Sequence, residues 1–211
     1  MTIAAILLAA GASRRMGQPK PLLTWGDETL IEFEYGQLAA SLVDDIVIVC
    51  GNRMEYVRRT LGDAARHIVF NPRWPQGRST SLAAGAAALL RRTVEEGAPR
   101  PDAIVIQNVD QPTRAAIIDR LIMERATGAH DIVQPSYVDA AGAIHGGHPV
   151  VVSGRLLEEL AAVTEATFGL RAVVQAHPPH RVPFEREPAV WLDLDTPDVL
   201  DEARRAFGVT G

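Results

Sequence analysis

A loop near the N-terminus holds the residues whose types and spacing best suit chemistry. After an apolar run, the chain reads Leu8-Ala9-Ala10-Gly11-Ala12-Ser13-Arg14-Arg15-Met16-Gly17-Gln18-Pro19-Lys20. Small residues let a ligand approach the main chain, consecutive N–H groups can form a nest for an anion, and Arg15 and Lys20 add positive charge. The loop is therefore predicted to cradle a polyphosphate, with a solvated loop that turns at Gly11 as the alternative.

The spacing within this loop matches neither of two common phosphate-binding patterns. G-x-x-x-x-G-K-[ST] fails on spacing, and G-x-G-x-x-G fails because Ser13 stands where the second glycine belongs. A P-loop ATPase and an ordinary NAD-binding site are therefore disfavoured. Lys20 is the only lysine among the 21 Lys and Arg residues. A site that needs a compact ammonium on a flexible stem would retain it, and chance is the alternative.

A carboxylate and a histidine pair are the next candidates. Asp110 follows the apolar run at residues 102–107, where a hard cation could bridge its carboxylate and phosphate oxygens. The alternative is that Asp110 only shapes the turn before Pro112. His145 and His148 flank two glycines, but no cysteine or obvious carboxylate nearby completes a zinc site, so a zinc site is rejected.

Short apolar runs alternate with longer helical patterns, which is typical of βα units. Strands are expected at residues 3–8, 45–50, 66–70, 102–107, 131–134, 149–152 and 190–194. Helices are expected at residues 30–42, 54–61, 79–95, 115–125, 154–163, 169–175 and 197–206. This order predicts one α/β domain over residues 1–211, with a Rossmann-like, doubly wound and mostly parallel sheet, plus a small antiparallel hairpin within 136–152. Ligands of such sheets bind beyond the carboxyl ends of the strands.

Composition excludes several classes of protein. The 211 residues carry a net charge of −5, which is unlike a basic nucleic-acid binder, and Cys50 alone cannot form a disulfide framework. Cys50 ends an apolar run and is expected to be a small buried side chain rather than a reactive thiol. No apolar stretch approaches the about 20 residues that a membrane span needs. We expect a soluble, cytoplasmic protein.

Five stretches in order along the chain resemble one family. They read LAAGASRRMGQPKPLL from residue 8, NPRWPQGRSTSLAAG at 71–85, NVDQPT at 108–113, GGHPVVVS at 146–153 and LDLDTPDVL at 192–200. This pattern resembles the MobA-like NTP transferases related to molybdenum cofactor biosynthesis. The resemblance implies a nucleotide-diphospho-sugar transferase type of fold. It also implies an enzyme that joins the nucleoside monophosphate of an NTP to a phosphorylated acceptor, releasing pyrophosphate with Mg²⁺ present.

The same resemblance implies a role for individual residues. Lys20, Arg15 and Asp110 would be catalytic, with Lys20 on the triphosphate and Arg15 on the outer phosphates. Metal would be bound by Asp110 with Asp195 or, less favoured, Asp193; the alternative for Asp195 is a cap of the helix at Pro197. Nucleotide-binding residues would be Leu8, Ala9, Ala10, Gly11, Ser13, Arg15, Met16, Gly17, Lys20, Gly77, Ser79 and Ser81. Acceptor-side residues would be Gln111, Gly147, His148 and Arg171.

The resemblance also implies which nucleotide base and which acceptor molecule the enzyme would use. Ala9-Ala10-Gly11 and Pro19 before Lys20 resemble the cytidylyl-transferring branch, so CTP is preferred over GTP, with molybdopterin as acceptor and a molybdoenzyme as recipient. Residues 166–171 lack the acidic residue of that branch, which suggests a divergent acceptor. An NAD(P)H-dependent oxidoreductase on the same scaffold and a non-catalytic nucleotide sensor are the alternatives.

Overall fold

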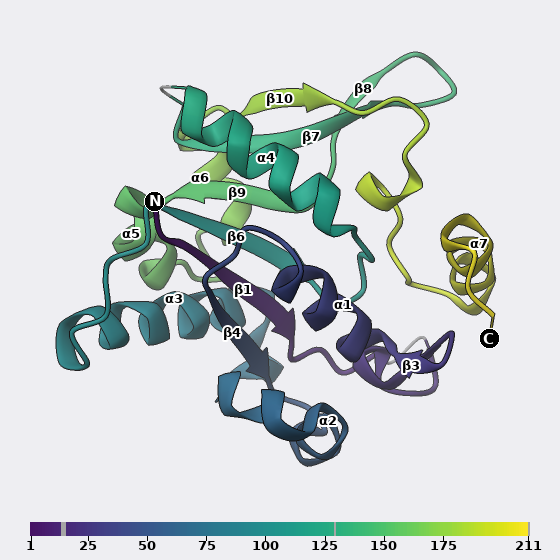
Figure 1. Ribbon diagram of the computed structural model, residues 1–211, viewed down its shortest axis with the longest axis horizontal. Coiled ribbons are helices and arrows are strands. Elements are labelled where there is room, and N and C mark those ends of the chain that lie inside the picture. Colours follow the sequence, from purple (N-terminus) through teal and green to yellow (C-terminus); the bar gives the residue numbers. More distant parts are fainter. Residues whose placement is uncertain (14–15, 129, 211) are drawn as a thin grey trace.

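The computed structural model describes residues 1–13, 16–128 and 130–210. Within these ranges one eight-stranded sheet has the order β10-β7-β9-β6-β1-β4-β5, with β8 paired to β7 (Figure 1). Its strands are β1 (Ile3–Ala9), β4 (Asp45–Cys50), β5 (Ile68–Phe70), β6 (Ala103–Asn108), β7 (Ile132–Val138), β8 (Ile144–Gly146), β9 (Val150–Ser153) and β10 (His180–Pro183).

The sheet is mixed but mostly parallel around its centre. β1 pairs in parallel with β4 and β6, and β4 continues in parallel to β5. β9 runs antiparallel to both β6 and β7, and β8 folds back on β7 as the expected hairpin. The predicted α/β class with a small antiparallel excursion is confirmed. The carboxyl ends of β1 and β6 lie side by side, which brings the loops after residues 9 and 108 together.

Helices cover both faces of the sheet. One face holds α1 (Leu30–Ala39), α2 (Met54–Leu61), α4 (Ala115–Thr127) and α7 (Pro197–Phe207), and the other holds α3 (Arg78–Glu95), α5 (Leu157–Ala162) and α6 (Leu170–Ala176). Successive residues of β1 enter opposite cores, with Ile3 and Leu7 on the first face and Ile6 on the second. A strand buried on both faces must be apolar throughout, which explains why β1 reads as a continuous apolar run.

Gly85 sets the distance between α3 and the sheet. A Cβ on Gly85 would lie 2.5 Å from Cγ2 of Ile6 and 3.0 Å from Cγ2 of Val49, whereas a Cβ on Gly36 of α1 would meet nothing within 4 Å. Both glycines are inside helices, where alanine gains about 1 kcal/mol of helix propensity. At Gly85 that gain is opposed by an overpacking cost of about 1–3 kcal/mol.

We expect Gly85→Ala to lower the free energy of unfolding by about 1 kcal/mol and Gly36→Ala to raise it by about 0.5–1 kcal/mol. Urea denaturation of the two variants beside the wild type measures both changes. Both substitutions add the same methyl group inside a helix. Opposite changes in the free energy of unfolding would therefore separate the effect of packing from that of helix propensity. Equal stabilisation by both variants would contradict the close approach of α3 to Ile6.

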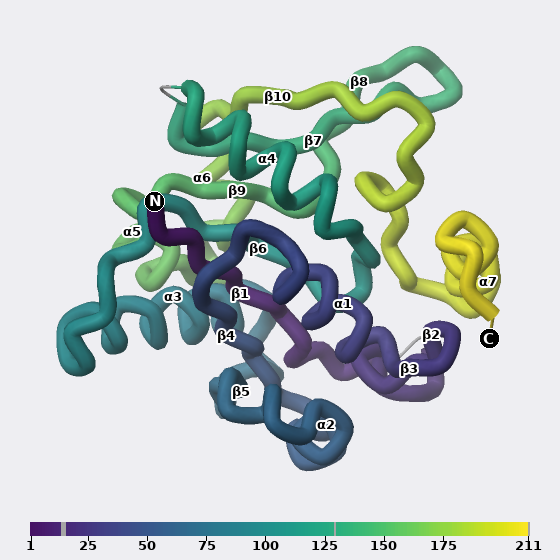
Figure 2. Tube along the Cα trace, viewed as in Figure 1, coloured from purple at the N-terminus to yellow at the C-terminus, as the bar shows by residue number. Residues whose placement is uncertain are grey.

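The C-terminal helix docks on the segment that follows Lys20. The short strands β2 (Thr24–Trp25) and β3 (Glu28–Thr29) form a two-stranded sheet, and Figure 2 shows α7 beside them. The ring centroids of Trp25 and Phe207 lie 5.2 Å apart, and Nη2 of Arg204 donates to the Thr24 carbonyl at 2.7 Å. The segment after Lys20 and the C-terminal helix are therefore held together, with Lys20 preceding the first and Asp195 preceding the second.

Two sequence predictions about strands were wrong. Residues 190–194 were expected to form a strand, but the chain is a 3₁₀ turn at Pro188–Val190 followed by irregular structure. Val190, Leu192 and Leu194 are buried as their pattern indicates, but they form no ladder. The N–H groups of Val190 and Leu192 bond within the local turn, while the Val190 carbonyl accepts from His148 and the Leu194 N–H donates to the Asp110 carbonyl. The edge strand β10 pairs in parallel with β7, on the side away from β9, in a segment that was expected to be a loop. In the described ranges, no helix combines the length and apolarity required to span a bilayer.

Candidate active site

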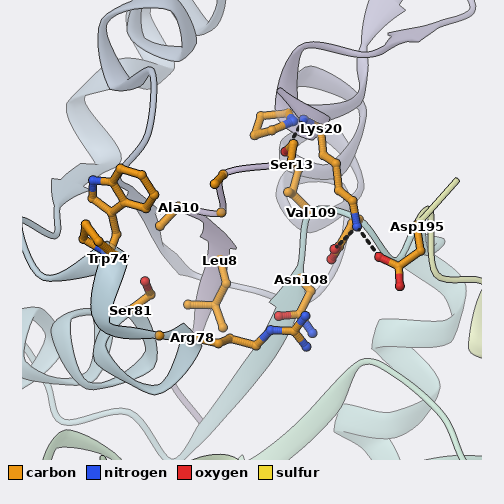
Figure 3. A pocket seen from close by; sticks show the side chains of 16 residues that line it. Leu8, Ala10, Ser13, Lys20, Trp74, Arg78, Ser81, Asn108, Val109 and Asp195 are labelled. Atoms are coloured by element: carbon orange, nitrogen blue, oxygen red, sulfur yellow. Dashed lines mark hydrogen bonds and ion pairs between the residues drawn. The ribbon is translucent and has the colours of Figure 1, made fainter. Parts of the chain in front are cut away.

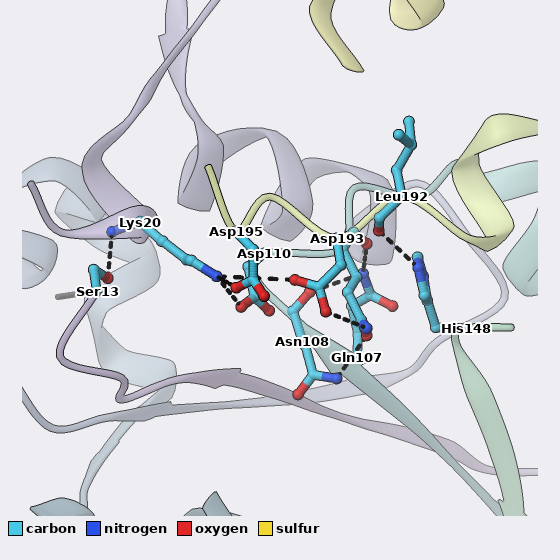
Figure 4. A network of polar contacts seen from close by, with 10 residues as sticks. Ser13, Lys20, Gln107, Asn108, Asp110, His148, Leu192, Asp193 and Asp195 are labelled. Atoms are coloured by element: carbon cyan, nitrogen blue, oxygen red, sulfur yellow. Dashed lines mark hydrogen bonds and ion pairs between the residues drawn. The ribbon is translucent and has the colours of Figure 1, made fainter. Parts of the chain in front are cut away.

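Lys20 lies among three carboxylates at the carboxyl edge of the sheet. Its ammonium nitrogen is 2.7 Å from Oδ2 of Asp110, 2.8 Å from Oδ1 of Asp195 and 3.8 Å from Oδ1 of Asp193 (Figure 4). Its backbone N–H donates to Oγ of Ser13 at 2.8 Å. Asp110 and Asp195 come 90 and 175 positions after Lys20 in the sequence, yet the three side chains form one charged cluster.

The electrostatics of the cluster keep Lys20 charged. Burial lowers the pKa of the Lys20 ammonium, but Asp110 and Asp195 outweigh burial, so this pKa lies above its usual value. The pKa of Asp193 is raised by burial and by the negative charges of Asp110 and Asp195, against Lys20 and Arg78. One ammonium thus faces three carboxylates, and the cluster can accept a further cation.

The three aspartates also have the chemistry of a site for a hard cation. Each offers one carboxylate oxygen, and these oxygens lie within 4.8 Å of one another. Oδ1 of Asp193 is buried and accepts no hydrogen bond from the described residues. Carboxylate oxygens are the preferred ligands of Mg²⁺ and Mn²⁺, so the donor set fits a divalent ion. Asp195 is not the helix cap, because Oγ1 of Thr196 accepts from the Val199 N–H.

A cavity of about 320 Å³ opens beside this cluster (Figure 3). Most of the residues predicted to bind nucleotide lie on its wall, namely Leu8, Ala10, Gly11, Ser13, Lys20, Gly77 and Ser81, together with Asp110 and Asp195. Sequence reasoning missed other residues of the wall, namely Ala12, Pro21, Trp74, Pro75, Arg78, Asn108 and Val109. Trp74 and Arg78 stand inside the motif at 71–85, so the motif pointed to their segment without assigning them.

Four predicted nucleotide residues do not line this cavity. The side chains of Ala9 and Met16 lie in the core under α1, and Gly17 is an exposed turn with a φ of +69°. Ser79 is buried, and its N–H donates to Oε1 of Glu165 at 2.5 Å. Arg15 lies outside the described residues, so its predicted role on the outer phosphates stays a prediction.

The loop after β1 turns at Ser13. This residue has a φ of +52°, in the left-handed region that favours glycine. Its carbonyl accepts from the Met16 N–H, and its hydroxyl accepts from the Lys20 N–H. The serine that breaks the dinucleotide pattern therefore adopts a conformation typical of glycine and anchors the backbone of Lys20.

Hydroxyls at the start of α3 face the other end of the cavity. Asn71 is buried, and its amide donates to Oγ1 of Thr80 at 2.9 Å and to Oγ of Ser81 at 3.0 Å. Oγ1 of Thr80 donates in turn to the Gly77 carbonyl at 2.8 Å. Thus Ser81 is held on the cavity wall by a network, with the indole of Trp74 beside it (Figure 3).

The predicted acceptor-side residues fall into two groups. Gln111 contacts the cluster, since its Oε1 accepts from Asn108 at 2.7 Å and its Nε2 donates to Asp193 at 3.4 Å. Gly147 and His148 instead brace the chain before Asp193. A Cβ on Gly147 would lie 2.2 Å from the Val190 carbonyl oxygen. Arg171 lies on α6, exposed and away from the cavity wall.

His148 is a buried neutral base. Only 7% of it is exposed, and its Nε2–H donates to the Leu192 carbonyl at 2.9 Å. Burial lowers the pKa of His148 to about 4, against the Leu192 hydrogen bond and the charge of Asp110. Its unfolded value is 6.5. Between these values the unfolded state binds the extra proton, so the stabilisation is complete above about pH 6.5 and is lost as the pH falls toward 4.

We expect the neutral burial of His148 to make the free energy of unfolding fall by about 3 kcal/mol between pH 6.5 and pH 4. His148→Gln retains a donor for the Leu192 carbonyl and removes the titration. Urea denaturation at several pH values in this range gives the free energy of unfolding as a function of pH. Its slope should be shallower for the variant, by an amount that corresponds to up to one bound proton. Identical slopes for the two proteins would show that His148 is not held neutral.

Cys50 is a structural side chain. It is fully buried at the end of β4, and burial raises the pKa of its thiol to about 12. The thiolate that reactive cysteines need is thus suppressed, as its apolar run indicated.

The model of the MobA-like NTP transferase domain matches residues 5–182. The chain belongs to the MobA-like NTP transferase family. This is a nucleotidyltransferase family, and the cavity of this chain lies beside an ammonium and three carboxylates.

Two curated relatives are similar over nearly their whole lengths. Nicotine blue oxidoreductase of Paenarthrobacter nicotinovorans is 28% identical over 95% of this chain and 89% of its own. Molybdenum cofactor cytidylyltransferase of Escherichia coli is 28% identical over 96% of this chain and 95% of its own. The two relatives carry different activities at equal identity, so identity alone does not separate them.

Solved structures support the fold. Rv0371c from Mycobacterium tuberculosis superposes with a TM-score of 0.77 at 26% identity, covering 97% of this chain and 99% of the other. A manganese complex of Rv0371c gives a TM-score of 0.70 at 24% identity, with the same coverage. The fold shared with Rv0371c therefore extends through essentially all of the described chain.

Proposed function

We propose that this MobA-like protein transfers the nucleoside monophosphate of CTP to a phosphorylated small molecule and releases pyrophosphate. The observation that carries the proposal is the direct contact of Lys20 with Asp110 at 2.7 Å on the wall of one cavity. Attack on the α-phosphorus builds negative charge on the equatorial oxygens and on the leaving pyrophosphate. A preorganised ammonium beside that position stabilises the charge without covalent chemistry by the protein.

Asp110 with Asp195 or Asp193 would hold a divalent ion, for which Mg²⁺ is the expected cofactor. Such an ion would bind phosphate oxygens and neutralise their charge. Lys20 would then orient both Asp110 and Asp195 through its two short contacts. The manganese complex of the similar Rv0371c supports the use of a divalent ion here, and the donor set fits Mg²⁺ equally well.

CTP is the proposed nucleotide because Ala9-Ala10-Gly11 and Pro19 resemble the cytidylyl branch, and because one curated relative is a cytidylyltransferase. The segment with Trp74 and Ser81 supports this by offering an aromatic face and a held hydroxyl to a base. Molybdopterin is the proposed acceptor, delivered after transfer to a molybdoenzyme. No nucleic acid or membrane is required, and a cytoplasmic location suits these substrates.

The test of this proposal measures pyrophosphate release. The protein is incubated with CTP, GTP, ATP or UTP, Mg²⁺ and either molybdopterin or its dephosphorylated form. We expect release with CTP and molybdopterin, and none when the acceptor lacks its phosphate. Absence of pyrophosphate with every nucleotide, in protein with a native circular dichroism spectrum, would contradict nucleotide transfer.

A second candidate is an NAD(P)H-dependent oxidoreductase, favoured by the similarity to nicotine blue oxidoreductase. Ser13 opposes it, because it occupies the position of a glycine in the dinucleotide pattern. Calorimetric titration with NADPH and with CTP plus Mg²⁺ separates the two candidates. Binding of NADPH without binding of CTP would favour the reductase. Binding of CTP without transfer to any acceptor would instead indicate a nucleotide sensor.

A further inference from the structure

Arg78 is a charged residue of the cavity that the motifs and the proposed function leave unused. It begins α3 and lines the cavity with Lys20, Asp110 and Asp195. In Figure 3 its side chain extends from the start of α3 toward Asn108, which lines the same cavity. Among the described residues it makes no ion pair, whereas Lys20 contacts two carboxylates. Its N–H donors therefore remain available to a ligand.

Arg78 lies between the residues predicted to bind the nucleotide and the residues predicted to face the acceptor. Gly77 and Ser81, on the nucleotide wall, belong to the same segment. On the other side, Asn108 donates to Gln111, which donates to Asp193. The positive charge of Arg78 also acts on the carboxylate of Asp193. A ligand at the guanidinium would adjoin both the nucleotide and the residues predicted to face the acceptor.

We propose that Arg78 binds the phosphate monoester of the acceptor. A guanidinium offers two parallel N–H groups to two oxygens of one phosphate. The third oxygen is then free to attack the α-phosphorus of the nucleotide. The new O–P bond forms as the bond from the α-phosphorus to the bridging oxygen breaks, and pyrophosphate leaves with that electron pair. Arg78 also offsets the repulsion between the two phosphate groups.

This inference rests on the proposed function and is tested through binding as well as turnover. The variants are Arg78→Met, Arg78→Lys and the control Arg73→Met, an exposed arginine of the same segment that does not line the cavity. Inorganic phosphate is titrated into protein saturated with Mg²⁺ and a CTP analogue that has a non-cleavable α,β-bridge. We expect Arg78→Met to weaken phosphate binding at least tenfold, Arg78→Lys to weaken it less, and Arg73→Met to leave it unchanged.

Turnover with molybdopterin adds a second readout. A rise in the acceptor KM without a change in the CTP dissociation constant supports the proposal for Arg78. Weaker CTP binding in Arg78→Met would assign the guanidinium to the nucleotide instead and overturn it, as would unchanged phosphate binding. If wild-type protein binds no nucleotide, the proposed function fails separately, and phosphate titration without nucleotide still tests Arg78.

A second inference rests on Glu34, a buried acid behind the Asp110 loop. It lies on α1 and is fully buried. One carboxyl oxygen accepts from the Thr113 N–H at 3.1 Å, and the other accepts from Nε2 of Gln107 at 2.8 Å. The same Gln107 amide donates to the carbonyls of Asn108 at 3.1 Å and Gln111 at 2.5 Å. Both ends of the loop at 108–113 therefore converge on one side chain.

The geometry points to Glu34 as a positioning residue for Asp110. Asp110 stands at the middle of that loop, and its carbonyl accepts from the Leu194 N–H at 2.8 Å. Loosening the loop would therefore displace Asp110 from Lys20 and also release the chain between Asp193 and Asp195. A buried donor or acceptor without a partner is costly, so removing the carboxyl leaves the Thr113 N–H and Gln107 amide to seek new partners.

Variants on α1 separate positioning from general packing. Glu34→Leu removes both acceptors, and Glu34→Gln retains one for the Thr113 N–H. Gln37→Leu is the control, because Gln37 accepts from the Ala115 N–H at 2.9 Å, beyond the loop. The probe is Mn²⁺ alone, followed by electron paramagnetic resonance, together with amide hydrogen exchange of residues 108–113.

We expect Glu34→Leu to weaken Mn²⁺ binding at least tenfold and to speed exchange in the loop. Glu34→Gln should restore most of the affinity, and Gln37→Leu should lower stability without changing Mn²⁺ binding. Where Glu34→Leu does not fold, Gln107→Met tests the same network from the other side. Wild-type Mn²⁺ affinity in Glu34→Leu or Gln107→Met, or equal losses in Gln37→Leu, would overturn the role of Glu34.

Discussion

We expect Lys20→Met to lower kcat for the proposed nucleotide transfer more than 100-fold and to leave the fold in place. The methionine retains the length and packing of the stem but removes the ammonium that contacts Asp110 and Asp195. Loss of one preorganised charge at a developing oxyanion costs about 3 kcal/mol in the barrier. Steady-state pyrophosphate release measures the change, and circular dichroism checks the fold.

Lys20→Arg is the matched control for charge. Arginine retains the positive charge, but its planar guanidinium is wider and longer than an ammonium held by two carboxylates at 2.7 and 2.8 Å. We therefore expect Lys20→Arg to recover little of the lost rate. Activity near wild type in Lys20→Met would remove Lys20 from the proposed mechanism. Full activity in Lys20→Arg together with a loss in Lys20→Met would show that only the positive charge at this position matters.

The central sheet could be predicted from the sequence because each strand is a buried run. β1, β4 and β6 are apolar on both faces, and their predicted bounds differ from the observed ones by at most one residue. The edges were less predictable. β10 contains His180, Arg181 and Pro183, because an edge strand has one side exposed and tolerates polar residues. Residues 190–194 are buried but form no strand, and an apolar pattern alone cannot distinguish a buried strand from a buried irregular segment.

In the candidate site too, some residues could be found from the local sequence, whereas the role of others depends on contacts between distant parts of the chain. Lys20 and Asp110 were predicted because each follows a strand, and the parallel pairing of β1 with β6 brings those loops together. Glu34 gave no local signal, since a glutamate on an amphipathic helix normally faces solvent. Its burial depends on α1 packing against the loop at 108–113, which only the folded chain reveals. The structural role of Gly147 likewise depends on the distant Val190 carbonyl.

The position of Asp195 depends on the docking of α7 against the segment that follows Lys20. α7 packs Phe207 against Trp25 and Phe33, and these contacts lie next to the segment that begins at Lys20. The loop before α7 is thereby fixed against that segment. The ion pair of Lys20 with Asp195 thus follows from the docking of α7, although neither residue belongs to the aromatic cluster.

Asp110 is the carboxylate most central to the cluster. We expect Asp110→Asn to abolish turnover and to weaken Mn²⁺ binding at least tenfold, while the circular dichroism spectrum stays unchanged. The substitution retains the size of the side chain but removes the charge that pairs with Lys20 and would bind a metal ion. A neutral amide is a weaker ligand for a hard cation than a carboxylate, and loss of a stabilising charge in the barrier costs about 3 kcal/mol or more.

Asp193→Asn and Asp195→Asn are compared with Asp110→Asn in the same titration. The one that lowers Mn²⁺ affinity as strongly as Asp110→Asn is the second ligand, and the structure favours Asp195 because it shares the Lys20 ammonium with Asp110 at 2.8 Å. The other variant should retain Mn²⁺ binding within about threefold, since it would retain both ligands. Wild-type turnover and Mn²⁺ affinity in Asp110→Asn would mean that neither the ion nor the triphosphate is bound at this edge of the sheet.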